Sequence, residues 1–446
     1  MALPSLPHRP PVPVPPGLPP VAARFWRYVQ VHTTSDPDVS TTPSTACQKD
    51  LGRLLVAELQ ALGLADAAMD DHGYVYATIA AAGDIPAAGD ASGLPAPSLP
   101  VLGLIAHLDT SPDAPGEHVR PVLHRAYQGE TVTLPGDPTV TLDPDRQPAL
   151  RDHLGHDLLT SDGTTLLGSD DKAGVAVLMQ LAEDFLSHAS GHGAAPRPAI
   201  RLLFTVDEEV GRGVEQLDLD RFGADVAYTV DGGAVGGIYA ETFNAAEATV
   251  RIEGVTVHPG YAKGVMVNAV EVLGAFLGML PDDETPATTD ERAGYFYAHR
   301  IPVATTAEAE VRLLLRDFDD DGMARRKRFL REQADTLRLR YPGARLTVTI
   351  RDQYRNMRRY IEETDPRAIA FALDAARAVG ITPQLELIRG GTDGARLSEK
   401  GLPTPNLFTG GHDFHSTFEW NTVQNLEQTL GYVKALVHHW GTHGKT

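Results

Sequence analysis

The stretch that decides the fold is VLGLIAHLD, residues 101–109. Its first six residues, Val101 to Ala106, form an apolar run that predicts a buried β-strand. His107 and Asp109 follow the run, and alternate residues of an extended chain share a side, so both side chains point out of the strand's end. An imidazole can ligate Zn²⁺ while a nearby carboxylate fixes the orientation of the ring. The alternative is a histidine that caps a turn with help from Asp109, so the pair needs support from the rest of the chain.

Strands and helices alternate downstream of this stretch. An apolar helix is predicted at Ala173 to Phe185, a second strand at Ile200 to Val206 and a third at Ala227 to Val230. This alternation favours an α/β sheet with helices on its faces. Ligands of open α/β sheets bind outside the carboxyl ends of the strands. The residues that follow each strand are therefore the candidates for a functional site.

Acidic residues occupy these positions. The second strand is followed by Asp207-Glu208-Glu209, the third by Asp231, and the apolar helix is preceded by Asp170 and Asp171. Taken singly, these are a solvated acidic turn, an ordinary turn aspartate and acids favoured by a helix dipole. Taken together with His107, they would place several carboxylates on one rim of the sheet. Their mutual repulsion there favours a bound cation.

A two-metal hydrolase site would use these groups in different roles. Two divalent cations roughly 3.5–4 Å apart can share a bridging carboxylate and a bridging water. Asp170 is the candidate bridge, and of Glu208 and Glu209 one could reach a metal and the other the water. A further histidine must come from later in the chain, where His412 and His415 are candidates. A glycine-rich turn that happens to contain histidines is the alternative.

Composition narrows the class of protein. A chain of 446 residues exceeds the size at which single cores stop growing, so two domains are expected. The net charge of −20 disfavours nucleic acid or an anionic membrane as a partner. No apolar stretch approaches the ~20 residues of a membrane span, and the first residues lack the order of a secretory signal, so a cytoplasmic location is expected. Cys47 is the only cysteine, so a metal would need His, Asp and Glu ligands.

The segments before and between these motifs are predicted to be structural. Residues 1–20 are dense in proline and predict an extended arm. Pro43-Ser44-Thr45 is predicted to cap a helix that has leucines along one face and ends at Gly63. The Ala/Gly/Pro-rich stretch from Ala80 to Pro100 is predicted to be a loop or insertion that carries no chemistry.

Several segments resemble the peptidase T family, tripeptide aminopeptidases among the co-catalytic dizinc enzymes that include aminoacylases, carboxypeptidase G and carnosinase. Three of them are Ile105-Ala-His107-Leu-Asp109-Thr-Ser-Pro-Asp113, Leu167-Gly-Ser-Asp170-Asp171-Lys172-Ala-Gly174 and Phe204-Thr-Val-Asp-Glu208-Glu209-Val-Gly211. The others are Tyr228-Thr-Val-Asp231-Gly-Gly, Val257-His258-Pro-Gly-Tyr-Ala-Lys-Gly-Val-Met-Val-Asn268-Ala, Arg316-Asp-Phe and Ile388-Arg389-Gly-Gly-Thr-Asp-Gly394. The resemblance covers about Val21 to the C-terminus. The chain departs from the family in the proline arm, in the loop near Ala80 to Pro100 and around His412, where the family more often has tyrosine.

The resemblance implies two domains. Residues 21–242 and 355–446 would form an α/β catalytic domain with a mixed, mostly parallel sheet flanked by helices. Residues 243–354 would form an inserted, smaller α+β lid domain. In the lid, the alternating pattern from Ala248 to Glu253 and the run from Val311 to Arg316 predict strands.

The resemblance also implies two Zn²⁺ per subunit. His107 and Asp231 would hold one zinc, Glu209 and His415 the other, and Asp170 would bridge them. Asp109 would orient His107 by a hydrogen bond. Glu208 would be the general base, which takes a proton from the bridging water and later delivers it to the leaving amine. Asp171 resembles the partner of Asp170 in a strained peptide of this family.

The implied partners are small peptides and a second copy of the chain, bound through the lid as a homodimer. His258 would reach an active site, often that of the dimer partner, to stabilise the tetrahedral oxyanion. Arg389, with Arg316 and Asn268, would grip the substrate carboxylate. The alternatives are a histidine at a strand end and arginines in surface salt bridges.

The implied function is a dizinc aminopeptidase that releases the N-terminal residue of tripeptides. One alternative is another dizinc hydrolase of the same family, such as a dipeptidase, a carboxypeptidase or an N-acyl amino acid amidohydrolase. A second is a non-catalytic peptide-binding protein on a decayed hydrolase fold. Decay would ordinarily remove a ligand or Glu208, and all of them are present.

Overall fold

The computed structural model describes residues 10–83, 99–187 and 196–445. Residues 1–9 of the predicted proline arm and residues 84–98 of the predicted loop lie outside the described residues. The rest of the arm leads into helix α1 (Pro20–Tyr28). The carbonyl oxygen of Val12 accepts hydrogen bonds from Gln30 Nε2 and Trp26 Nε1, each 3.1 Å long. The described part of the arm is therefore tied to α1 and the turn that follows it.

The chain divides into two compact units. The first consists of Met1–Ala240, Ile361–Glu386 and Thr392–Thr446, and the second of Glu241–Tyr360 and Leu387–Gly391. The segment predicted as a lid, residues 243–354, lies inside the second unit.

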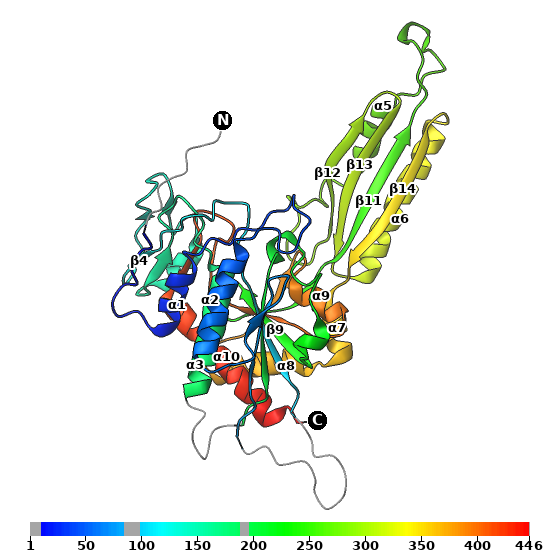
Figure 1. Cartoon of the computed structure of the whole chain (residues 1–446). Coiled ribbons are helices and arrows are strands. Elements are labelled where there is room, and N and C mark those ends of the chain that lie inside the picture. Colours follow the sequence, from blue (N-terminus) through cyan, green and yellow to red (C-terminus); the bar gives the residue numbers. More distant parts are fainter. Residues whose placement is uncertain (1–9, 84–98, 188–195, 446) are drawn as a thin grey trace, which may run out of the picture. The chain divides into compact units, whose positions relative to one another are not determined.

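An eight-stranded sheet forms the centre of the first unit (Figure 1). Its strands follow the order β1 (Ala68–Met69), β2 (Val75–Ile79), β8 (Ile200–Thr205), β3 (Leu102–His107), β9 (Val226–Gly232), β16 (Asn406–Phe408), β10 (Gly237–Thr242) and β15 (Gln384–Ile388). The central strands β8, β3, β9 and β16 pair in parallel, and antiparallel pairs flank them. All six residues of β3 are buried, which explains why this strand is apolar without alternation. The predicted mixed α/β architecture is confirmed, with the parallel pairing at its centre.

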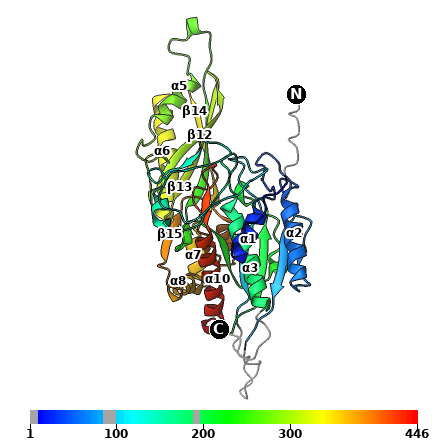
Figure 2. The same cartoon turned by 90° about the vertical axis from the view of Figure 1, so that its left-hand side faces the viewer.

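Helices cover the sheet of the first unit. The apolar helix α3 (Ser169–Ser187) packs on β3 and β9, and it contacts α1 and α10 (Val423–His443), which lie beside it in Figure 2. Helix α2 (Gln48–Ala61) also packs against α3, and α8 (Arg367–Ala378) packs against α10. Two smaller sheets consist of β4 (Val122–His124), β7 (Leu158–Thr160) and β17 (Trp420–Thr422), and of β5 (Val132–Thr133) and β6 (Thr141–Leu142). Within the described ranges, no helix combines the length and the apolar character that crossing a membrane requires.

The start of helix α2 differs from the prediction. Its N-cap residue is Cys47, which makes no side-chain capping bond, so the predicted cap at Pro43-Ser44-Thr45 is wrong. Ser44 instead donates its backbone N–H to the two carboxylate oxygens of Asp207, at 2.7 and 3.0 Å. Asp207 is fully buried after β8, and a buried carboxylate needs such donors. The predicted end of the helix is confirmed, since the helix stops at Ala61 and Gly63 has φ +101°.

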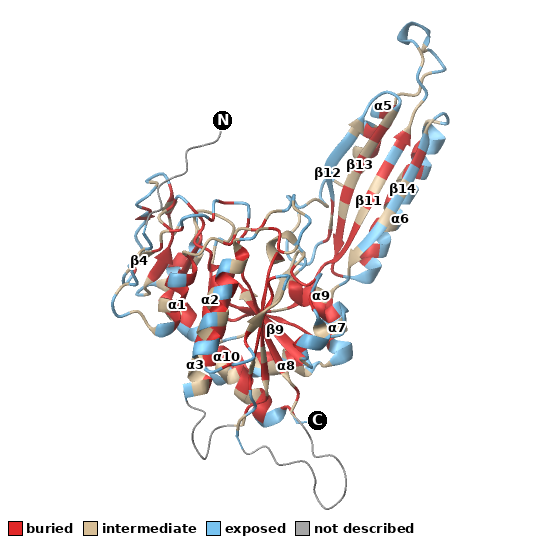
Figure 3. Ribbon diagram, in the orientation of Figure 1, coloured by how far each residue is buried: buried red, intermediate tan, exposed pale blue. Residues whose placement is uncertain are grey.

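The second unit has an antiparallel sheet of four strands. Their order is β12 (Tyr295–Ala304), β13 (Glu308–Asp317), β11 (Asn244–Glu253) and β14 (Arg345–Tyr354). Helices α5 (Ala269–Leu277) and α6 (Asp320–Arg340) contact each other and pack on this sheet. In β11, Ala246, Ala248, Val250 and Ile252 are fully buried, whereas Thr249 and Arg251 are not. This is the alternation predicted for a half-buried strand, and Figure 3 shows it along the strands of this unit.

Candidate metal centre

His107 ends strand β3 and is 2% exposed. Its Nε2 lies 2.8 Å from Asp170 Oδ1 and 3.3 Å from Asp231 Oδ1. Its Nδ1 lies 3.1 Å from the carbonyl oxygen of Asp109 and 3.4 Å from Oδ1 of the same residue. Because Asp109 holds Nδ1–H, Nε2, which faces the two carboxylates, is the ring nitrogen available to a metal. That tautomer is the one a metal-ligating histidine with a supporting acceptor adopts.

Asp170 lies between two histidines. Its Oδ1 faces His107, and its Oδ2 lies 3.3 Å from Nε2 of His415. Asp170 and Asp171 have non-helical backbone angles at the start of α3, and the peptide bond between them is cis. Because each oxygen of Asp170 faces a different histidine, this carboxylate has the geometry of a group shared by two cations.

Glu209 supplies an oxygen that lacks a partner. It lies in the short 3₁₀ turn Glu208–Val210 directly after β8, and its Oε2 is 2.8 Å from His415 Nε2. Its Oε1 is buried and has no hydrogen-bond partner among the described residues. A buried carboxylate oxygen without a partner is unfavourable, and a cation would satisfy it. Imidazole nitrogens and carboxylate oxygens are ligands that suit zinc and similar divalent metals, so the residues present fit a metal.

Two groups of three side chains each bring their ligand atoms within 4.8 Å of one another. One consists of His107, Asp170 and Glu209, and the other of His107, Asp171 and Asp231. In the described part of the chain neither group includes Glu208 or His415, although Nε2 of His415 lies 2.8 Å from Oε2 of Glu209. The oxygens of Asp171 already accept the backbone N–H groups of His107, at 3.1 Å, and Gly174, at 3.0 Å. Asp171 therefore holds the backbone of His107, whereas Oδ1 of Asp231 faces the ring nitrogen Nε2 of His107.

Asp109 connects His107 to the acidic turn. Its carboxylate is fully buried and accepts the backbone N–H of Glu208 on Oδ1, at 3.1 Å, and that of Glu209 on Oδ2, at 3.2 Å. One side chain thus supports the histidine and fixes the turn that carries the two glutamates. The sequence predicted the first of these contacts but not the second.

Three carboxylates of the centre have a raised pKa, whereas Asp170 does not: burial would raise its pKa, but His107 and His415 outweigh burial and hold it below the usual value. Burial, with the charge of Asp170 nearby, raises the pKa of Glu209 to about 8. Burial also raises the pKa of Asp231 to about 6, although His107 opposes the change. Burial, Asp231 and Asp393 together raise the pKa of Glu208 well above its usual value. The largest cause of all three shifts is burial, which disfavours the charged form, and neighbouring carboxylates add to it.

The histidines shift in the opposite sense. Burial lowers the pKa of His107, but Asp231, Asp109 and Asp170 outweigh it and raise that pKa well above the usual value. Hydrogen bonds to Asp170 and Glu209 raise the pKa of His415 to about 11. In the absence of metal, protonated histidines therefore supply the positive charge that the carboxylates need.

These shifts predict how the stability of the metal-free protein depends on pH. The folded site keeps a proton on Glu209 up to about pH 8, whereas the unfolded chain releases it near 4.5. Unfolding therefore releases protons in this range, and the free energy of unfolding falls as the pH rises. The raised pKa of His415 acts in the same direction above about 6.5. We expect the melting temperature of EDTA-treated protein to fall as the pH rises from about 5 to about 8. Over the same range the melting temperature of zinc-loaded protein should fall less. Parallel pH profiles of the two forms would contradict this reading of the site.

His412, the other candidate histidine, belongs to an aromatic cluster. Its ring stacks on Trp420, with 4.1 Å between the ring centres and 13° between the planes. Burial lowers its pKa to about 4, so the ring is neutral. His415 is the candidate that the structure places beside the carboxylates.

His258 and Asn268, predicted to bind substrate, lie in the second unit and cap helices. Nδ1 of His258, which is exposed, accepts the N–H of Gly260 at 3.1 Å, before the turn Pro259–Tyr261. Asn268 Oδ1 accepts the N–H of Val270 at 3.0 Å, at the start of α5. Both side chains therefore have a local structural role.

Arg316 and Arg389, also in the second unit, have protein acceptors. Arg316 is 9% exposed, and its Nη1 donates to the carbonyl oxygen of Leu315 at 2.9 Å. Arg389 donates to the carbonyl oxygens of Glu291 and Ala293, at 2.8 and 3.0 Å. It also lies over the ring of Phe243, at 5.2 Å. Substrate binding by these arginines, by His258 and by Asn268 stays a prediction.

Two buried carboxylates beside the centre were not predicted from the sequence. Asp393 begins helix α9 (Asp393–Glu399) and accepts a hydrogen bond from Thr205, the residue paired with His107 between β8 and β3. Glu419 accepts the backbone N–H groups of Leu167, Gly168 and Asp170. The sequence pattern that could have indicated a buried Glu419 is its position between two aromatic residues, Phe418 and Trp420.

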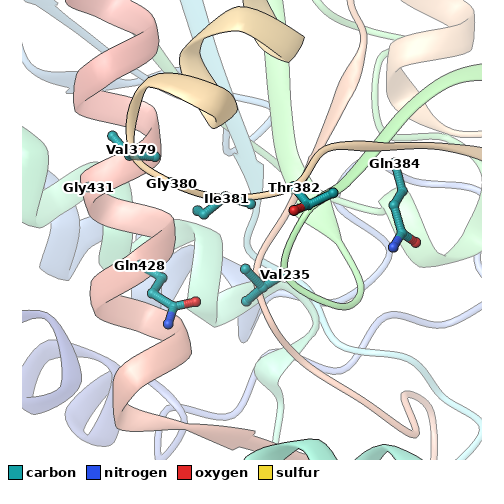
Figure 4. A pocket seen from close by; sticks show the side chains of 8 residues that line it. All are labelled: Val235, Val379, Gly380, Ile381, Thr382, Gln384, Gln428 and Gly431. Atoms are coloured by element: carbon teal, nitrogen blue, oxygen red, sulfur yellow. The ribbon is translucent and has the colours of Figure 1, made fainter.

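A separate cavity of about 530 Å³ lies elsewhere in the first unit (Figure 4). It is lined by Val235, Val379, Gly380, Ile381, Thr382, Gln384, Gln428 and Gly431. No candidate ligand and no ionisable side chain is among these lining residues. The cavity therefore offers neither a metal site nor an acid or base.

Known proteins match this chain over nearly its whole length. A family model described as a peptidase dimerisation domain matches residues 240–337. The chain is 42% identical to peptidase T of Geobacillus kaustophilus over 415 residues, which is 93% of this chain and 96% of the relative. It is 40% identical to peptidase T of Bacillus subtilis over 414 residues, with the same two coverages, 93% and 96%.

Solved structures share the fold. Aminopeptidase PepT of Bacillus cereus aligns with a TM-score of 0.70 at 22% identity, over 94% of this chain and 98% of that one. A tripeptidase of Staphylococcus aureus aligns with a TM-score of 0.69 at 21% identity, over 95% and 98%. A dinuclear metal-binding peptidase of the M20 family from Bacillus subtilis aligns with a TM-score of 0.60 at 14% identity, over 94% and 96%.

Proposed function

Because this chain belongs to the peptidase T family, we propose that it is an aminopeptidase that releases the N-terminal residue of tripeptides with two Zn²⁺ per subunit. The observation that carries the proposal is Asp170, whose two oxygens face His107 and His415 separately. The description of the Staphylococcus aureus relative as a tripeptidase supports the substrate class. The description of the Bacillus subtilis M20 peptidase as dinuclear supports two metals.

Five residues would hold the cations. His107 and Asp231 would bind one, Glu209 and His415 the other, and Asp170 would contact both. The short distances within each set and the unpartnered oxygen of Glu209 support this division. When bound, the two cations would polarise the scissile carbonyl and make water more acidic.

Glu208 would move the proton in this reaction. It would take a proton from the attacking water and deliver it to the nitrogen of the leaving dipeptide. The raised pKa of Glu208 suits a group that must hold a proton between these two steps. The backbone N–H of Glu208 donates to Asp109, and this hydrogen bond would hold Glu208 close to the cations although Glu208 itself binds neither of them.

A substrate panel tests the proposal against other hydrolases with the same ligand set. We expect zinc-loaded protein to release the N-terminal amino acid of tripeptides with a higher kcat/KM than it shows for dipeptides or N-acyl amino acids. The matched control is the same tripeptide with an acetylated N-terminus. Preferential cleavage of acylated substrates would favour an amidohydrolase, and release of the C-terminal residue would favour a carboxypeptidase.

Replacing Asp109 by Ala separates orientation from metal binding. We expect activity to fall about 10–100-fold, because the variant loses the support of His107 and of the Glu208 turn while every proposed ligand remains. Metal content measured after gel filtration should stay at two per subunit. The exposed Asp71→Ala variant is the control for removal of an aspartate. Loss of both metals from Asp109→Ala would contradict this division of roles.

The second unit would form the dimer. The match to a peptidase dimerisation domain over residues 240–337 supports a homodimer built through the lid segment 243–354. Sedimentation of the full chain tests this directly, since a monomer at micromolar concentration would contradict it.

A further inference from the structure

Glu419 is a buried carboxylate to which the proposed reaction gives no role. It precedes β17 and is 1% exposed. Its Oε2 accepts the backbone N–H of Leu167 at 2.8 Å and of Gly168 at 2.7 Å. Its Oε1 accepts the backbone N–H of Asp170 at 2.9 Å. Because both oxygens are occupied by backbone donors, Glu419 does not compete with the proposed ligands for a metal.

These bonds join two segments that are distant in the sequence. Glu419 lies in the segment of His415, and its own N–H donates to the carbonyl oxygen of Ser416 at 3.3 Å. Asn421, two residues later, donates from Nδ2 to the hydroxyl of Ser169 at 2.9 Å. The turn that presents Asp170 is therefore bonded to the segment that presents His415.

The turn depends on this support because it is irregular. Gly168 has φ +82°, a conformation that most residues avoid, and the backbone angles of Asp170 are non-helical. Its N–H groups precede the regular part of α3, so the helix supplies no acceptor for them. Hydrogen bonds to a carboxylate are about twice as strong as those between neutral groups. A single buried carboxylate thus accepts three of the four backbone N–H groups from Leu167 to Asp170.

We propose that Glu419 is a positioning residue that fixes the backbone from Leu167 to Asp170, so that Asp170 faces His107 and His415 together and both metals bind tightly. This inference rests on the proposed function, because it requires Asp170 to be a metal ligand. It adds to that function a determinant of metal affinity that touches neither metal nor substrate.

The Glu419→Gln variant tests the proposal with little change in size. Glutamine offers one acceptor oxygen, so when that oxygen serves Leu167 and Gly168, its amide N–H₂ meets the N–H of Asp170. We expect Zn²⁺ affinity, measured by titration of metal-free protein against a chromophoric chelator, to fall about 10–100-fold. Hydrogen exchange at the amides of Leu167, Gly168 and Asp170 should accelerate in the metal-free protein, and kcat should fall more than KM rises.

Glu241→Gln is the matched control. Glu241 is 7% exposed and its carboxylate accepts hydrogen bonds from Arg292 and Asn356 in the second unit. The variant makes the same chemical change at another buried glutamate, and metal affinity and the exchange of the three amides should match the wild type.

The outcomes separate the inference from the proposed function. Wild-type protein that binds no Zn²⁺ would overturn the proposed function. Wild-type protein that binds two Zn²⁺ while Glu419→Gln binds them equally well, with unchanged amide exchange, would overturn the inference alone. If Glu419→Gln is not recovered folded, Glu419→Asp takes its place with the same readouts, because it keeps the charge and shortens the reach by one methylene.

Discussion

Replacing Glu208 by Ala is expected to abolish measurable tripeptide hydrolysis while both cations remain bound. A general acid and base contributes about 10²–10⁴-fold to a rate, and Glu208 would serve in both steps of proton transfer. Glu208 is not among the five residues proposed to hold the cations, so its removal leaves the proposed ligand set complete. Initial rates and metal content, measured on the same gel-filtered sample, check the two halves of this prediction.

The exposed Glu215→Ala variant is the control, because Glu215 lies on the same loop and faces solvent. It should keep wild-type turnover. Activity retained in Glu208→Ala would remove Glu208 from the role of base. Loss of a metal from that variant would instead identify Glu208 as a ligand.

Replacing Asp170 by Ala is expected to remove both cations and all activity. Asp170 contacts His107 at 2.8 Å and His415 at 3.3 Å, so one substitution takes a ligand from each proposed site. It also leaves the buried His107 and the half-buried His415 with fewer acceptors. Metal analysis should find fewer than one tightly bound cation per subunit.

Two histidine variants serve as a matched pair for this prediction. His415→Ala should lose one cation, because His107 and Asp231 remain. His412→Phe should keep both, since His412 stacks on Trp420 and phenylalanine preserves that packing. Two cations retained in Asp170→Ala would show that Asp170 is no bridge.

Much of this architecture was predictable from the sequence, because burial leaves a clear pattern. The strands β3, β8 and β9 were expected from apolar runs. Glu208 and Glu209 come after the end of β8, whereas β9 is longer than predicted and includes Asp231 as its penultimate residue. The sequence also named the five proposed ligands, which the structure brings together. The local pattern alone left open the choice between Glu208 and Glu209 and the choice between His412 and His415, and the resemblance to the peptidase T family decided both.

The unpredicted features depend on contacts between distant segments. Ser44 looked like a helix cap, but the buried carboxylate of Asp207, 163 positions later, takes its N–H. Asp109 was predicted to serve His107, and its second role appears only where β3 and β8 lie side by side. Glu419 reaches a turn about 250 positions earlier. The pattern of apolar and polar residues does not predict such contacts, because the partners are backbone N–H groups, which every residue except proline carries.

The central claim is that a two-metal site in the first unit hydrolyses tripeptides. Its most direct test is a titration of metal-free protein with Zn²⁺, with release of the N-terminal amino acid from a tripeptide followed at each addition. The proposed site predicts that activity is absent without metal, rises with added Zn²⁺ and levels off at two equivalents per subunit. Hydrolysis that persists after the metal is removed by a chelator, or that does not increase as Zn²⁺ binds, would contradict the claim.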